Sequence, residues 1–201
     1  MTHMRKKTGL RSLRRFRRDQ DGVAMVEFAM AFPIMLVAYC GLVDVAQMVM
    51  LNRKVTQLAS TLSDLTARVQ SVTPSDIDNI FNASQTVLMP FGTSNASMVI
   101  ANVVVDAGGT ARVCWSNQRN ATAPARGSTV TLPDSARIPG TSVIMARASY
   151  KYTPAIGYVI TGTFTLGDNP VYSRPRNGLA TGVENIEQVV RTGTNGCPNF
   201  S

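Results

Sequence analysis

Side chains that could perform catalysis or bind a metal are few in this sequence and widely spaced. The single histidine of the 201 residues is His3, so the body of the chain has no residue for a Ser-His, Cys-His or histidine-metal mechanism. The acidic residues of the second half follow no motif and have no Gly-rich phosphate loop beside them; they are Asp106, Asp134, Asp168, Glu184 and Glu187. We therefore expect no enzyme, no cofactor and no metal site.

One carboxylate is notable for its surroundings. Residues 23–43 have the sequence VAMVEFAMAFPIMLVAYCGLV, in which Glu27 is the only charged side chain. A helix of this length spans roughly 30 Å, the hydrocarbon thickness of a bilayer. A carboxylate at the centre of such a span costs roughly 3 kcal/mol, which makes Glu27 a functional hypothesis; the alternative is that it snorkels to the interface.

The apolar span follows a basic leader. Residues 1–22 hold eight Lys or Arg and two Asp, a net charge of +6, so the rest of the chain carries only +2 of the total of +8. Cations before the span predict a cytoplasmic N-terminus, and lipid head groups account for them without a nucleic-acid partner. We expect a single-pass membrane protein whose remainder lies outside the cytoplasm. A cleaved secretory signal and a buried helix of a soluble core are the alternatives.

The boundary between leader and span resembles the class III signal of type IV prepilins. That signal is a short basic leader ending in Gly, with a cut after the Gly and a Glu at the fifth position of the mature chain. The resemblance implies processing between Gly22 and Val23 by a prepilin peptidase, with Glu27 as the fifth mature residue. It also implies that Glu27 offsets the N-terminal amine of a neighbouring subunit, because an ion pair in lipid costs less than a lone charge.

More narrowly, residues 16–45 resemble the TadE-like family of Flp/Tad (type IVc) pilus assembly, whose domain would cover about residues 16–58. The processed pseudopilins of this system usually have Tyr after the Glu, whereas this chain has Phe28, so the resemblance leaves cleavage open. It implies a bacterial inner-membrane location, a periplasmic C-terminal domain, and partners among pseudopilins and the inner-membrane platform. The matching positions are Asp21, Gly22, Val26, Glu27, Phe28, Ala29, Pro33, Gly41 and Asp44.

Beyond the span, apolar residues continue at heptad spacing, which predicts one helix from Gly22 to near Gln70, roughly 70 Å long. The stripe could pack on the chain's own extracytoplasmic domain or form a seam with a partner helix, since both uses bury the same residues. Its members are Met48, Leu51, Val55, Leu58, Leu62, Leu65 and Val69.

The remaining sequence predicts a small α+β domain with an antiparallel sheet, so the whole chain has a pilin-like plan. Thr73-Pro74-Ser75-Asp76 predicts a helix start. Strands are expected at 97–105, 110–116 and 141–152, with edge strands at 163–166 and 171–173. Residues 117–140 are expected to be a long loop, 155–162 a buried turn or an apolar surface for a partner, and 184–191 a helical turn. The domains are thus a leader (1–22), a transmembrane helix (23–46), its continuation (47–72) and an extracytoplasmic domain (73–201).

The three cysteines divide by environment. Cys40 lies in the apolar span and is expected to be an ordinary small apolar residue. Cys114 and Cys197 fall in the extracytoplasmic part, where the compartment is oxidising, so a disulfide is expected, with two free thiols as the alternative. Their spacing is not that of a zinc site.

The function that these features favour is a membrane-anchored minor pseudopilin or assembly component of a Flp/Tad pilus. It would act through helix–helix and head-domain contacts, with assembly residues Glu27, Phe28 and Pro33. The alternative is a single-pass envelope binding or adhesion module that uses the 117–140 loop and the arginines Arg112, Arg119 and Arg126.

Overall fold

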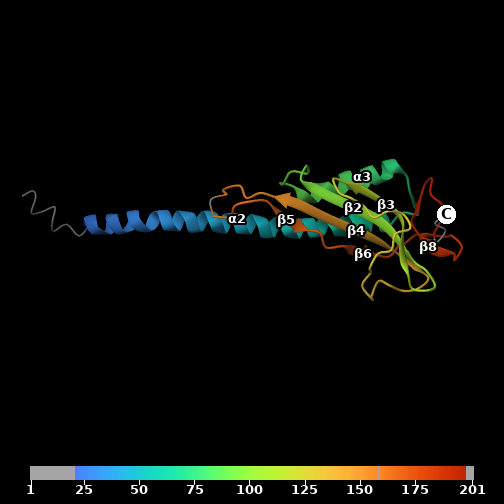
Figure 1. Ribbon diagram of the computed structural model, residues 1–201. Helices are drawn as coiled ribbons and strands as arrows, with labels where there is room; N and C mark the ends of the chain where they lie inside the picture. The colour runs from blue at the N-terminus through green and yellow to red at the C-terminus, as the bar shows by residue number, and fades with distance from the viewer. Residues whose placement is uncertain (1–20, 158, 198–201) are drawn as a thin grey trace, which may run out of the picture.

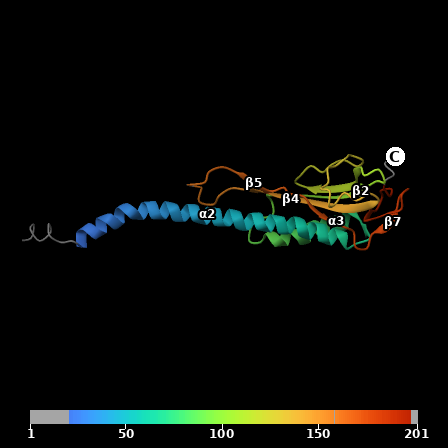
Figure 2. The same cartoon turned by 90° about the horizontal axis from the view of Figure 1, so that it is seen from below.

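A single long helix organises the molecule (Figure 1). The computed structural model describes residues 21–157 and 159–197, so the predicted leader lies almost entirely outside the described residues. Helix α2 spans Asp21–Ala67, 47 residues without interruption, and includes Pro33. Its N-terminal half extends away from the rest of the protein, and Figure 2 shows that it bends there. Its C-terminal half lies against a small α+β head, so the predicted fold class is confirmed.

The heptad stripe packs on the head. Leu51, Val55, Leu58 and Leu62 are completely buried in the core that the helix shares with the sheet, and Met48 and Val69 pack against its margin. Of the two predicted uses of the stripe, packing on the chain's own domain is therefore the one found.

Helix α3 (Pro74–Gln85) begins with the predicted cap. The Thr73 hydroxyl accepts a hydrogen bond from the Asp76 backbone N–H, and the Asp76 carboxylate accepts one from the Thr73 backbone N–H. This reciprocal capping box satisfies two amides that the first turn would leave unpaired. The helix buries Ile77 and Phe81 beside α2, and a short 3-10 turn, η1 (Thr86–Leu88), follows it.

The central sheet has five strands. They are β2 (Ala96–Val105), β3 (Ala111–Arg119), β4 (Thr141–Tyr152), β5 (Phe164–Gly167) and β6 (Val171–Ser173). The order is β3-β2-β4-β5, with β6 also pairing with β4, and all pairings are antiparallel. The predicted strands are therefore present, although β3 continues to Arg119 and the long loop begins later than residue 117.

Each face of the sheet buries its own core, because alternate residues of a strand point to opposite sides. Met98, Ile100 and Ile144 face α2 and α3. Val103, Val113 and Val143 face the other way, under Leu132 and Ala136 of the β3–β4 loop. The loop thus covers the face of the sheet that the helices leave open.

Our prediction for the C-terminal segment is wrong. Residues 184–191 form no helical turn but include strands β8 (Ile186–Gln188) and β9 (Val190–Arg191). Strand β8 pairs with β7 (Leu179–Thr181), and β9 pairs in parallel with β1 (Ser71–Val72). Ile186 and Gln188 are buried on alternate positions, so tertiary pairing overrides the weak helical preference of this short stretch.

A β-bulge turns Cys114 toward the C-terminal segment. Asn102 pairs with Trp115 and Val103 with Val113, so Cys114 is the extra residue of β3. Consecutive strand residues normally face opposite sides, but the bulge places Cys114 and Trp115 in the same core. Cys114 is joined there to Cys197 by a disulfide, and Trp115 Nε1 donates a hydrogen bond to the carbonyl of Val189 (2.7 Å). The predicted disulfide is present.

Candidate functional site

The most unusual surface of the protein is the N-terminal half of α2. Its 18-residue window of highest mean hydropathy (2.0) is only 11 % buried, and this is the one helix among the described residues long and apolar enough to cross a membrane. The exposed apolar side chains cover every side of the helix, which is typical of a surface that contacts lipid or other apolar helices. They include Val23, Met25, Val26, Phe28, Met30, Phe32, Ile34, Met35, Leu36, Val37, Tyr39 and Leu42.

The residues proposed for processing and assembly all lie on this surface. The bond between Gly22 and Val23 is in the first turn of α2, and both residues are exposed. Glu27 is exposed one turn later. The ring of Phe28 lies beside that of Phe32, with 5.7 Å between the centroids. Sequence spacing therefore places Gly22, Glu27 and Phe28 on two successive turns, and no head residue within 71–157 or 159–197 reaches them.

Two residues further along α2 have a contact that sequence reasoning missed. The loop between β4 and β5 folds back onto the helix, where Val159 contacts the backbone of Gly41 so closely that a methyl group on Gly41 would lie 3.3 Å from Val159 Cγ1. The Asp44 carboxylate is fully buried there and accepts a hydrogen bond from the Ile156 backbone N–H (3.3 Å). The signal available in the sequence was the G-x-x-D spacing of these two residues.

Asp44 also influences a tyrosine of the sheet. Tyr152, at the end of β4, is buried, and its hydroxyl lies 3.5 Å from Gln47 Oε1 of α2. Burial, followed by the negative charge of Asp44, raises the pKa of the Tyr152 hydroxyl above its usual value near 10. The base of the head is thus joined to the helix by a carboxylate, an amide and a phenol.

This geometry can be compared with known families. The sequence model of the TadE-like protein family matches residues 22–62. The chain carries a TadE-like segment. That segment covers nearly all of α2, both its exposed half and most of the half that packs on the head. No curated protein and no solved structure matches the chain.

The TadE-like segment implies a membrane protein associated with Flp/Tad pili. The N-terminal half of the helix that carries this segment is apolar and exposed, as is required of a helix that spans a membrane. The segment includes Gly41 and Asp44, so the contact with the β4–β5 loop lies within the matched region. The head of the protein, in contrast, lies outside the matched region, so the role of the head has to be argued from the contacts that the head makes.

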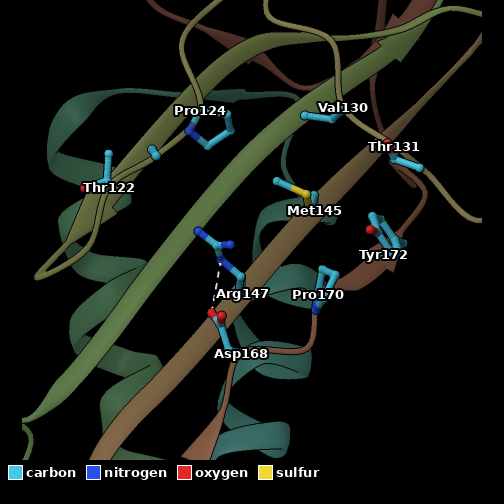
Figure 3. A pocket seen from close by; sticks show the side chains of 10 residues that line it. Thr122, Pro124, Val130, Thr131, Met145, Arg147, Asp168, Pro170 and Tyr172 are labelled. Carbon is cyan, nitrogen blue, oxygen red and sulfur yellow. Dashed lines mark ion pairs between the residues drawn. The ribbon is translucent and has the colours of Figure 1, made fainter. Parts of the chain in front are cut away.

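A second candidate surface is a pocket of about 460 Å³ on the outer face of the sheet (Figure 3). Met145 and Arg147 rise from β4 on one side of it, and Pro124, Val130 and Tyr172 close the others. Arg147 Nε lies 3.4 Å from Asp168 Oδ1, and both side chains are partly exposed. The lining is mainly apolar with one ion pair, which suits a small apolar group or a side chain of another protein.

The arginines near the long loop are engaged within the head. The Arg119 guanidinium lies over the Phe81 ring, 5.0 Å from its centroid, and donates to Asp78 and Asn82. Arg126 donates to backbone carbonyls of Cys114 and Asn195. The contacts of Arg119 join β3 to α3, and those of Arg126 attach the loop to the sheet and to the C-terminal segment. Within residues 21–157 and 159–197, no cluster of three or more His, Cys, Asp or Glu side chains could hold a metal ion.

Proposed function

We propose that this protein is a minor pseudopilin or assembly component of a Flp/Tad pilus, anchored in the bacterial inner membrane with a periplasmic head. Its N-terminal half of α2 lies in the bilayer and contacts the helices of neighbouring subunits. The head contributes further contacts, and no catalytic step is needed for this role. The inner-membrane platform and the other pseudopilins are the partners that the proposal names.

The observation that carries the proposal is the division of α2 into two halves with opposite surroundings. Leu51, Val55, Leu58 and Leu62 are completely buried against the head, whereas before Gly41 apolar side chains are exposed all around the helix. A soluble protein rarely leaves so large an apolar surface uncovered. The TadE-like segment includes the whole exposed half, and this supports lipid and pilus subunits as what covers that half.

Glu27 is the residue that the proposal assigns to assembly. It lies four residues beyond Val23, about 6 Å along the helix, within the edge of the hydrocarbon region. Cleavage after Gly22 would remove the cations of the leader and leave a new amine at Val23. In a bundle of subunits, the carboxylate of one chain can pair with the amine of the next, and this pairing removes a lone charge from lipid.

Substitution of Glu27 tests this role. Glu27→Ala and Glu27→Gln, introduced into a strain that lacks its own copy, are expected to abolish Flp pili on the cell surface while the chain remains in the membrane fraction. Met25→Ala is the matched control, since it changes an exposed side chain of the same turn without changing charge, and is expected to leave piliation intact. Normal piliation with Glu27→Ala would remove Glu27 from the assembly mechanism.

The alternative, an envelope binding or adhesion module, has one specific observation in its favour, the pocket beside Arg147. Met145→Trp would fill that pocket from the β4 side. Loss of cell attachment with normal numbers of pili would favour the binding module, whereas unchanged attachment would favour a purely structural head.

A further inference from the structure

The β4–β5 loop, residues 153–163, differs in chemistry from the rest of the head surface. Its sequence TPAIGYVITGT contains no charged residue. In both views its described residues, 153–157 and 159–163, are the part of the head that extends furthest along α2 toward the N-terminus (Figures 1 and 2). Ile156 and Val159 are 38 % and 49 % exposed, so the loop carries apolar side chains on its outer side as well as against the helix.

The loop is held at a fixed height on the helix. Val159 contacts Gly41, and the Ile156 amide donates to Asp44. At 1.5 Å per residue, Gly41 lies about 27 Å and Asp44 about 32 Å from Val23. The hydrocarbon core of a bilayer is about 30 Å thick. If the apolar half of α2 spans the membrane, these two contacts lie at its outer boundary.

The loop also covers Asp44, a carboxylate of α2 that would otherwise be exposed at this level of the helix. A carboxylate on α2 at this level would face lipid if nothing covered it, which is unfavourable near the bilayer centre and less so near its edge. The loop buries Asp44 completely and supplies one backbone N–H to Oδ1, while Oδ2 has no hydrogen-bond partner among the described residues. If the apolar half of α2 spans the membrane, the outer side of the loop that covers Asp44 lies beside lipid.

We propose that the β4–β5 loop inserts into the head-group region of the outer leaflet and seats the head on the membrane surface. Ile156 and Val159 enter the boundary between head groups and acyl chains, as apolar side chains of interfacial segments do. Exposed Lys151, just before the loop on β4, faces the phosphate layer, where a cation is favourable. The head then has a defined height and tilt, which a single helical anchor would not give. This inference rests on the proposed membrane anchoring of α2.

Fluorescence quenching by lipids tests the insertion. The full-length chain, with Cys40→Ser and its Cys114–Cys197 disulfide intact, is reconstituted at one chain per phosphatidylethanolamine–phosphatidylglycerol nanodisc. An environment-sensitive dye is attached at Ile156→Cys, or at Ala155→Cys if the first variant does not fold. Leu36→Cys on α2 is the control inside the bilayer. Val183→Cys is the matched aqueous control, because it is an exposed apolar position at the β7–β8 turn.

The expected result is a blue-shifted emission at Ile156 that is quenched by lipids carrying a quencher near the head group. The dye at Leu36 should be quenched by deeper probes, and the dye at Val183 by neither. An unquenched dye at both loop positions with a quenched dye at Leu36 would overturn the loop insertion and leave the anchor intact. An unquenched dye at Leu36 would overturn the anchor itself. A dye at Ile156 that is shielded only after other pilus subunits are added would show that protein, not lipid, covers the loop, and would also overturn the proposal.

Discussion

Gly41 of α2 and Val159 of the β4–β5 loop lie in direct contact although 118 positions separate them, and a Cβ on Gly41 would be 3.5 Å from the Cβ of Val159. The absence of a side chain at Gly41 lets the loop approach the helix backbone. This contact fixes the position of the head relative to the apolar half of the helix. It therefore links the fold of the head to the proposed function of the anchor.

That distance makes a disulfide possible. Natural disulfides join Cβ atoms about 3.5–4.5 Å apart, so Gly41→Cys combined with Val159→Cys, in a Cys40→Ser background, should crosslink under mild oxidation. Leu42→Cys with Val159→Cys is the control, since Leu42 is exposed. The crosslink is read as a new linked peptide pair by mass spectrometry without reduction. Equal crosslinking of both pairs would mean that the loop is not held against Gly41.

Gly167, at the end of β5, is a second close approach of the sheet to α2. It has a positive φ of 84°, and a methyl group there would collide with the Val55 side chain and lie 2.7 Å from the carbonyl oxygen of Ala148. Gly167→Ala is expected to lower the free energy of unfolding by about 3 kcal/mol, from backbone strain and overpacking together. Gly109→Ala has a similar φ but open space, so it should cost only about 1 kcal/mol. Equal losses in urea denaturation would exclude the contact with Val55.

The Cys114–Cys197 disulfide closes a loop that contains most of the head. With a sequence separation of 83, chain entropy predicts a loss of about 4–5 kcal/mol in the free energy of unfolding when the bridge is removed. Cys114→Ser with Cys197→Ser should therefore unfold at a much lower urea concentration than wild type. Added reductant should lower the stability of wild type but not of the double variant. Equal stability of the two proteins without reductant would contradict this prediction.

The raised pKa of Tyr152 predicts that the folded protein loses stability at alkaline pH. The neutral phenol is favoured in the folded state, because burial and the Asp44 charge both oppose ionisation. Its contribution is fully present below the unfolded-state pKa near 10 and is lost as the pH rises through the higher folded-state pKa. The melting temperature of detergent-solubilised wild type should fall as the pH rises above about 10, and that of Tyr152→Phe should fall less. Parallel curves would show that another group causes this loss of stability.

Local signals in the sequence predicted much of this fold. Thr73 and Asp76 start α3 because a capping box depends only on residues three apart. The turn at Asp106–Gly109, which joins β2 and β3, is likewise held by local hydrogen bonds. The heptad stripe predicted the length of α2 but not its partner, because a domain core and a partner helix select the same apolar residues.

Features that depend on distant contacts could not be predicted. Strand β9 exists because it pairs with β1, which is far away in the sequence, so residues 184–191 gave no reliable local signal. The bulge at Cys114 depends on the register between β2 and β3. The burial of Asp44 depends on the β4–β5 loop, and the pocket at Arg147 depends on the path of the long loop and of the segment after β5. The positions of Gly22 and Glu27 on α2, in contrast, could be predicted from the sequence, because they depend on a single helix.

The central claim is that the apolar half of α2 is a permanent membrane anchor for the head. Alkaline carbonate extraction of membranes from cells that make the full chain tests it most directly. The account predicts that the protein, detected through its head, stays in the membrane pellet. Its recovery in the supernatant as a soluble protein would contradict the anchor and, with it, the assignment to the pilus.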